Sequence, residues 1–220
     1  MPLQLRADIH WCDCGGRAVF LDTIGDRYFC LPQSANDAFL RLAASRPAPG
    51  DAARLRSLVE NEILVESGAP RWVGQPPAIA APMHDLGDCR NGGPMLATLA
   101  LLAAEVRAAR ALRRRPFHQI LAAARERALQ RPSPSPGTAR SIERIAAAAR
   151  ALAFITGRHD RCLVRALAAH AMCKRSGSEA SLVLGVIAHP FTAHCWVQAG
   201  NAVVVGGYEQ ARLYTPILAI

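Results

Sequence analysis

The spacing of apolar residues divides the chain into a strand-rich beginning, a helical middle and a strand-rich end. Short apolar runs bounded by turn residues predict the early strands, and apolar residues that recur every three or four positions predict two helices after them. The expected strands are 10–13, 17–22 and 27–31, with a hairpin turn at Gly15-Gly16, and the expected helices are 34–44 and 51–64, the second capped by Asp51. Residues 1–70 are therefore predicted to form a small α+β domain.

A segment rich in proline and glycine, 71–94, is predicted to be a linker between two domains. After it the period is helical up to Gly177, and then it changes to that of strands. The expected helices are 95–114, 116–130, 141–155 and 160–175, with a loop at 131–137 and Asp160 as a cap, and the expected strands are 181–187, 192–198 and 202–205. Residues 95–220 thus form a second domain, and the fold class of the chain is α+β.

Length and composition exclude several classes of protein. The chain has 220 residues, of which 51% are hydrophobic, which is too apolar for a disordered chain and enough for a sizeable core. No uncharged apolar run reaches the roughly 18–20 residues of a membrane span, and the first residues lack the pattern of a signal peptide. We expect a cytoplasmic protein with no membrane partner.

The formal charge of +9 raises the question of nucleic acid. Of the 26 basic residues, 25 are Arg and only Lys174 is Lys; the segment 107–131 carries eight Arg against Glu126 alone. An RNA, an acidic peptide or a protein partner would suit this segment, but Phe117 is its one aromatic residue for stacking on bases. We interpret it as a solvated basic face and expect no nucleic-acid partner.

The seven cysteines do not form the framework of a disulfide-rich protein, because a cytoplasmic location keeps thiols reduced. They are Cys12, Cys14, Cys30, Cys89, Cys162, Cys173 and Cys195. The pair Cys12 and Cys14, with His10 before it, lacks the second pair of ligands that a structural zinc site needs. We therefore predict no metal.

Cys162 is the strongest candidate nucleophile, because it falls in the first turn of a predicted helix. The helix dipole and free N–H groups there stabilise a thiolate, and Arg161 and Arg165 are expected to add positive potential. Cys173 lies near the end of the same helix, where the dipole opposes a thiolate.

His194 is the matching candidate base. On the alternating strand 192–198 it shares one face with Trp196 and Gln198, and the other, apolar face is expected to face the core. The alternative for a histidine on a strand is a core residue with its hydrogen bonds satisfied.

A cysteine that opens a helix, followed by an apolar strand and a histidine on the next strand, is the order found in transglutaminase-like and papain-like cysteine enzymes. More specifically, the second half resembles the C-terminal domain of lasso-peptide B proteins, the leader peptidases of a ribosomal peptide pathway, in the strings CLVRALAAHAMCKRSG, ASLVLGVIAHPFTAHCWVQAGNAVVV and YTPILAI. The N-terminal string GGRAVFLDTIGDRYFCLP resembles the peptide-recognition domain of fused B proteins. The resemblance implies a winged-helix-like peptide-recognition domain, a helical region and a transglutaminase/papain-like cysteine protease domain.

The resemblance assigns the family nucleophile to Cys162 and the family base to His194. The family's third member, an Asp, would stand twelve residues after the histidine, where this chain has Gly206. Three interpretations stay open: the Cys–His pair suffices, another acid such as Glu209 substitutes, or the domain is impaired and keeps a binding role. A gain of cleavage on replacing Gly206 by Asp would indicate an impaired site.

The resemblance also implies that the first domain captures a leader peptide as an added strand. The edge strand 27–31 and a facing helix would supply the contacts, with the candidate residues Tyr28, Phe29, Cys30, Leu31, Leu55, Leu58 and Val59. The implied partners are the precursor peptide and a macrolactam synthetase, the C protein. No phosphate-binding loop of the form GxxxxGK[ST] occurs, so we expect no cofactor in this chain and assign ATP to the synthetase.

Two other classes of function remain as alternatives. A Cys–His acyltransferase or true transglutaminase would use the same pair of residues with an amine in place of water. A transcriptional regulator is disfavoured, because Arg54 and Arg56 of the predicted helix 51–64 are accompanied by Glu60 and Glu62.

Overall fold

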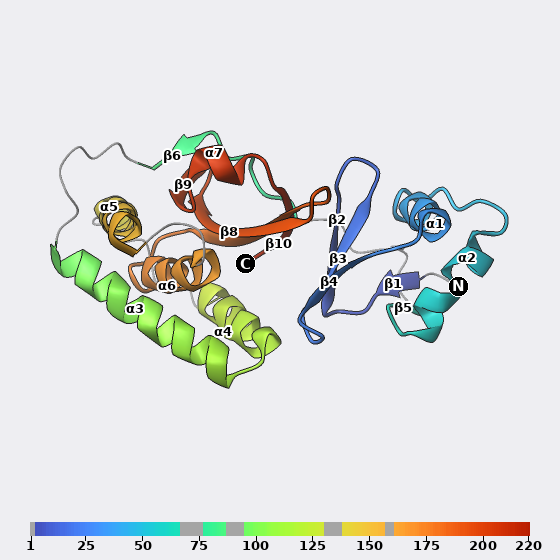
Figure 1. Cartoon of the computed structure of the whole chain (residues 1–220), viewed down its shortest axis with the longest axis horizontal. Coiled ribbons are helices and arrows are strands. Elements are labelled where there is room, and N and C mark those ends of the chain that lie inside the picture. Colours follow the sequence, from blue (N-terminus) through green and yellow to red (C-terminus); the bar gives the residue numbers. More distant parts are fainter. Residues whose placement is uncertain (1–2, 67–76, 87–94, 130–137, 157–160) are drawn as a thin grey trace. The chain divides into compact units, whose positions relative to one another are not determined.

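The computed structural model describes residues 3–66, 77–86, 95–129, 138–156 and 161–220, which form two compact units (Figure 1). The first unit contains Met1–Ala78 with Val186–Thr192 and Thr215–Leu218, and the second contains Ile79–Gly185, Ala193–Tyr214 and Ala219–Ile220. The predicted cap Asp160, the predicted loop 131–137, Cys89 and most of the predicted linker 71–94 lie outside the described residues.

The first unit contains an antiparallel sheet in the order β2 (Ile9–Asp13), β3 (Ala18–Asp22) and β4 (Arg27–Cys30). The predicted hairpin turn is present: the Cys14 N–H donates to the Arg17 carbonyl at 2.9 Å, and Gly15 and Gly16 have φ of 66° and 86°. Both values favour glycine over residues with a Cβ. Every residue of the central strand β3 is buried.

Two helices, α1 (Gln33–Ala43) and α2 (Asp51–Glu60), follow the sheet. The predicted helix 51–64 is too long, because Glu62 takes a left-handed φ of 54° and ends the helical path. Leu64 instead begins β5 (Leu64–Glu66), which pairs antiparallel with β1 (Leu3–Leu5). Neither strand was predicted, since three residues are too few to show a period.

The core of the first unit is built around aromatic rings from both kinds of element. Phe39 of α1 meets Trp11 edge-on at 5.0 Å between ring centroids and Phe20 at 4.8 Å, while Phe20 stacks on Phe29 at 5.0 Å. Phe39 thus attaches α1 directly to β2 and β3, and Phe29 of β4 joins the cluster through Phe20.

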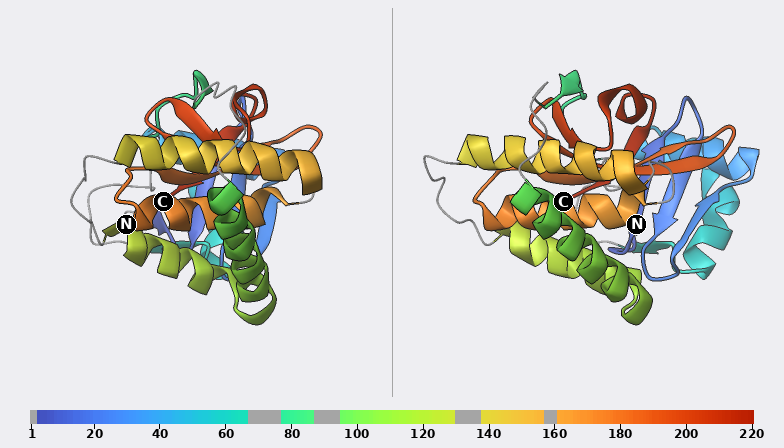
Figure 2. Two further views of the ribbon diagram at one scale, coloured as in Figure 1. Left: turned by 90° about the vertical axis from the view of Figure 1, so that its left-hand side faces the viewer. Right: turned by 60° about the vertical axis from the view of Figure 1, so that its left-hand side comes forward.

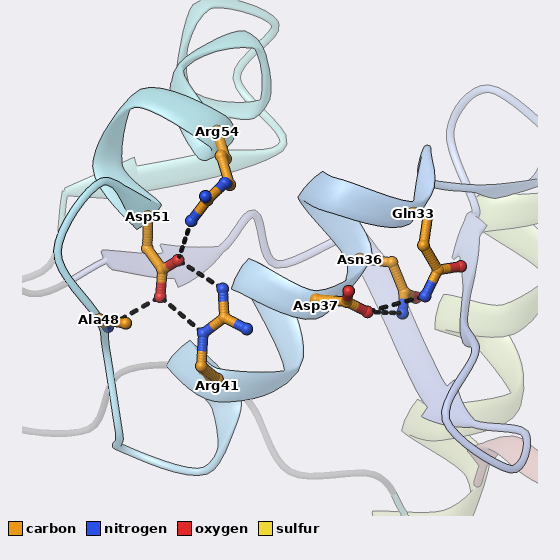
Figure 3. A network of polar contacts seen from close by, with 7 residues as sticks. All are labelled: Gln33, Asn36, Asp37, Arg41, Ala48, Asp51 and Arg54. Atoms are coloured by element: carbon orange, nitrogen blue, oxygen red, sulfur yellow. Dashed lines mark hydrogen bonds and ion pairs between the residues drawn. The ribbon is translucent and has the colours of Figure 1, made fainter.

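A cluster of polar contacts joins α1 to α2 (Figure 3). The buried carboxylate of Asp51 accepts hydrogen bonds from Arg41 at 2.6 and 3.0 Å, from the Ala48 N–H at 2.8 Å and from Arg54 at 3.2 Å. Helix α2 has its N-cap at Gly50, so Asp51 is the first residue of the helix and not the cap that we predicted. These donors hold the pKa of Asp51 well below its usual range.

The remaining described elements are helices and a five-stranded sheet, and most of their residues belong to the second unit, whereas Val186–Thr192 and Thr215–Leu218 belong to the first. The helices are α3 (Met95–Arg114), α4 (Phe117–Leu129), α5 (Thr138–Thr156), α6 (Cys162–Arg175) and the short α7 (Tyr208–Ala211). The sheet has the order β10-β7-β8-β9-β6, with β6 (His84–Asp85), β7 (Ser181–Ile187), β8 (Thr192–Ala199), β9 (Ala202–Val205) and β10 (Thr215–Ala219). Figure 2 shows the long helices α5, in yellow, and α6, in orange, running beside the red strands, and both contact β9. The chain thus has a mixed helix and sheet fold.

Three of these elements, β6, α7 and β10, were not predicted from the sequence. Strand β6 lies within the predicted linker and pairs parallel with β9, His84 opposite Ala202 and Asp85 opposite Val203. Helix α7 follows the turn at Gly206 and Gly207, and Asp85 accepts the Tyr208 N–H at its start at 2.8 Å. Among the described helices, none is long and apolar enough to cross a membrane.

Candidate active site

Cys162 is the first residue of α6, as predicted, and its side chain is half-buried. It lines a cavity of about 290 Å³ together with His194. The other described lining residues come from α5, α6, α7, β6, β8, the end of β9 and the turn before α7. They are Asp85, Ala149, Arg150, Ala153, Arg165, Cys195, Val204, Val205, Gly206, Gly207, Glu209 and Gln210. The two residues chosen from the sequence therefore face the same space.

The arginines beside Cys162 are arranged differently from our expectation. Arg165 is buried and donates to Glu105 at 2.8 Å, and Arg161 lies 3.7 Å from the other oxygen of that carboxylate. Because Glu105 is itself buried on α3, it offsets much of their positive charge. The electrostatic support for a thiolate at Cys162 is thus mainly the N-terminus of α6.

His194 lies on β8 and is 7% exposed. Its ring centroid lies 6.0 Å from that of Trp196, in a stacked arrangement, and 5.2 Å from that of Tyr214. Trp196 is fixed in turn, since its Nε1–H donates to the Gln198 side chain at 2.7 Å. The predicted apolar face of this strand, with Cys195 and Val197, is buried, and His194, Trp196 and Gln198 on the other face are buried as well.

The imidazole of His194 is oriented by main chain. Its Nε2 lies 3.2 Å from the carbonyl oxygen of Gly206, so Nε2–H donates to that oxygen in the tautomer that leaves Nδ1 unprotonated. Burial lowers the pKa of His194, and the bond to the Gly206 carbonyl partly opposes this. Gly206, which stands where the resemblance implies an Asp, thus contacts the imidazole through its backbone carbonyl.

An aspartate side chain has no room at this position. Gly206 has φ of 119°, and a Cβ built on it would lie 2.5 Å from the Cβ of Trp196. A gain of cleavage in Gly206→Asp is therefore no longer a sound test of an impaired site, because the substitution would displace Trp196 first.

Two carboxylates line the cavity. Glu209, the substitute acid considered from the sequence, is 76% exposed at its side chain and pairs with Arg212 at 2.8 Å. Asp85 comes from β6 and was missed, because it belongs to the predicted linker and is brought to the cavity by pairing with β9. Oδ1 of Asp85 accepts the Tyr208 N–H, and the residue is exposed.

The other described cysteines are in different surroundings. Burial raises the pKa of Cys173 to about 12, and burial also raises the pKa of Cys195 well above its ordinary value. Cys12 and Cys14 lie 3.7 Å apart between sulfurs, and burial raises the pKa of Cys12 as well. Within the described residues, no group of three His, Cys, Asp or Glu side chains is placed to hold a metal ion.

The seven candidate leader-binding residues fall into two groups. Leu31, Leu55 and Leu58 are buried in the core of the first unit, whereas Cys30 and Val59 are exposed and Tyr28 and Phe29 are half-buried. The main neighbours of α2 are α1 and β5, while β4 pairs with β3 at one side of the sheet. The exposed Cys30 and Val59 thus belong to elements with different neighbours.

The comparisons with known proteins identify the class to which this fold and site belong. The model of the transglutaminase-like superfamily matches residues 102–219, just over half of the chain, and this range includes Cys162, His194 and Gly206. The chain belongs to the transglutaminase-like superfamily, which is consistent with cysteine protease or acyltransferase activity. No curated protein and no solved structure matches the chain significantly.

Proposed function

We propose that the chain is a cysteine leader peptidase that binds the leader of a ribosomal lasso-peptide precursor and removes it before a partner synthetase closes the macrolactam. The observation that carries this proposal is the shared cavity: Cys162 at a helix start and His194 with an oriented imidazole face one space in a transglutaminase-like domain. The resemblance to lasso-peptide B proteins supplies the substrate class.

In the proposed reaction, Nδ1 of His194 takes the proton of the Cys162 thiol, and the sulfur attacks the carbonyl carbon of the last leader residue. The free N–H groups at the start of α6 stabilise the developing oxyanion. The imidazolium then protonates the leaving amine of the core peptide, which leaves the leader as a thioester on Cys162. Water, deprotonated by His194, adds to the thioester, and the leader departs as a free acid.

Gly206 acts in this scheme as a positioning residue. Its carbonyl holds Nε2–H of His194 and thereby keeps the lone pair on Nδ1. This supports the first of the three interpretations of the missing acid, a Cys–His pair that works without a carboxylate partner. No cofactor is proposed for this chain, and ATP is assigned to the synthetase, the C protein.

The first unit is proposed to capture the leader. Strand β4 ends the order of its sheet, so its outer edge can pair with an extended peptide, and Tyr28, Phe29 and Cys30 lie on it. Val59 is a second exposed candidate, whereas Leu31, Leu55 and Leu58 support this surface from the core.

The test combines the protein with its cognate precursor peptide, with and without the synthetase, and follows the leader by mass spectrometry. Cys162→Ala and His194→Ala are expected to lose cleavage, and Cys173→Ala, a buried cysteine on the same helix outside the cavity, is expected to retain it. Cleavage by Cys162→Ala at the parent rate would refute the proposed nucleophile.

The same assay separates hydrolysis from acyl transfer. A peptidase releases the leader with a free carboxyl group even when a primary amine such as methylamine is added. An acyltransferase would give mainly the methylamide, which differs in mass. Binding of the precursor with neither product would show the third alternative, an adaptor without activity.

A further inference from the structure

A second cavity, of about 510 Å³, lies between α3, α4 and α6 and shares no lining residue with the first. Small apolar side chains form its floor, among them the buried Ala104, Ala124, Leu167 and Ala168. Six arginines surround it: Arg107, Arg110, Arg114, Arg115, Arg127 and Arg175. Five of these belong to the basic segment 107–131, which the proposed function leaves without a role.

The described residues do not balance the charge around this cavity. None of its described lining residues is acidic, and within the described part of the chain these six arginines form no ion pair. By contrast, Arg165 on the neighbouring face of α6 is neutralised by Glu105. A set of like charges around a hollow repels itself and concentrates anions from solution.

The lining of the cavity also includes a buried polar group that has no partner among the described residues on one of its atoms. His170 of α6 lines the cavity and is 2% exposed. The Ala180 backbone takes one hydrogen bond of its ring, but Nε2 has no partner among the described residues. Burial, together with the nearby Lys174 and Arg127, lowers the pKa of His170 to about 4, so the ring is neutral and Nε2 presents a lone pair. Leaving such an acceptor unsatisfied is costly, and a ligand that donates to it recovers that cost.

We propose that this cavity binds a small phosphate monoester whose apolar body carries an N–H or O–H group. The arginines hold the dianionic phosphate by charge-assisted hydrogen bonds, the alanine and leucine floor covers the body, and the donor of the body reaches Nε2 of His170. This inference does not depend on the proposed peptidase activity.

The test is isothermal titration calorimetry on the full chain with 4-aminophenyl phosphate, phenyl phosphate, aniline and inorganic phosphate. We expect saturable one-to-one binding. The affinity should be highest for 4-aminophenyl phosphate, lower for phenyl phosphate and lowest of the three for aniline, and inorganic phosphate should bind more weakly than phenyl phosphate. Arg114→Gln is expected to weaken binding of 4-aminophenyl phosphate by about tenfold. The matched control is Arg113→Gln, an exposed neighbour on α3 that does not line the cavity and should leave binding unchanged.

His170→Asn tests the buried acceptor, because it leaves the arginines in place. It should bind the two phenyl phosphates equally, since the preference for the amino group requires Nε2. The proposal is overturned by the absence of saturable binding, by equal losses in Arg113→Gln and Arg114→Gln, or by a preference for the amino group that survives in His170→Asn. Tighter binding of hexaglutamate with the same dependence on Arg114 would overturn it in favour of a docking surface for acidic peptides.

Discussion

At the scale of single residues, Gly206 determines what can stand opposite His194. Its φ of 119° and its closeness to Trp196 leave no space for a side chain. We therefore predict that Gly206→Ala and Gly206→Asp lose leader cleavage and lower the free energy of unfolding by roughly 3 kcal/mol. Thermal unfolding and the cleavage assay measure the two effects.

Gly200 is the matched control for this prediction. It also has a positive φ, of 58°, but a Cβ there would meet nothing within 4 Å. Gly200→Ala should cost only about 1 kcal/mol and leave cleavage unchanged. Full activity in Gly206→Asp would mean that the site contains space that the structure does not show.

His170 makes stability depend on pH in a direction that follows from its pKa. Unfolding returns that pKa from about 4 to the ordinary 6.5, so between these values the unfolded chain binds a proton that the folded chain does not. Stability should therefore fall as pH is lowered from 6.5 to 4, by about 3 kcal/mol from this residue. Urea unfolding of the parent and of His170→Asn at pH 6.5 and pH 4 isolates the contribution of His170 to the free energy of unfolding. Equal pH dependence in the two proteins would contradict this prediction.

The residues of the candidate site differ in how far sequence could predict them. The positions of Cys162 and His194 could be predicted from the sequence, because a helix start and an alternating strand are local patterns. The Gly206 carbonyl was not, since every residue has a carbonyl and only the fold shows which one meets the imidazole. Asp85 reaches the cavity through parallel pairing with a strand far along the chain, which no local pattern reveals.

At the scale of elements, the carboxylate of Asp51 on α2 joins this helix to α1 through Arg41. Asp51→Asn keeps the shape of the side chain but removes the charge that Arg41 and Arg54 pair with. We predict that it lowers the melting temperature by roughly 5 °C at neutral pH. Because the pKa of Asp51 is depressed, the difference between parent and variant should be present above pH 4 and disappear as the pH is lowered further.

Asp37→Asn is the control within the same region (Figure 3). Among the described residues, Asp37 accepts hydrogen bonds from side chains of its own helix, from Gln33 at 2.9 Å and weakly from Asn36 at 3.4 Å. Its loss should change the melting temperature by about 1 °C or less. A similar fall in the melting temperature of both variants would show that the contacts of Asp51 stabilise the protein no more than those of Asp37.

The accuracy of the predicted elements follows their length. The predicted ranges 95–114 and 181–187 coincide with α3 and β7, because both contain sustained periods. The helix 51–64 was extended too far, since Ile63 and Leu64 continue its apolar spacing although Glu62 has already turned the backbone. Strands β1, β5 and β6 have two or three residues and depend on their partners, so their sequences contain no signal.

At the scale of the whole molecule, capture and cleavage of the precursor are proposed to belong to different units, so they should separate kinetically. Cys30→Asp places a charge on the exposed end of β4, and we predict a KM for the precursor about tenfold higher with kcat changed by less than about twofold. Leu99→Asp, on an exposed position of α3, controls for the general loss of apolar surface. A fall in kcat with KM unchanged in Cys30→Asp would place the effect at the reaction and not at capture.

The short segment before α3 has a consequence for how this protein can be divided into two chains. Gln198, which fixes Trp196 beside His194, donates to the Ala80 carbonyl at 2.8 Å, and Asp85 accepts the first N–H of α7. A gene fission just before Met95 would leave both groups without these partners and strip β6 from the sheet. A separately encoded catalytic subunit must therefore carry residues 79–86 as its own N-terminal extension, ahead of the first helix.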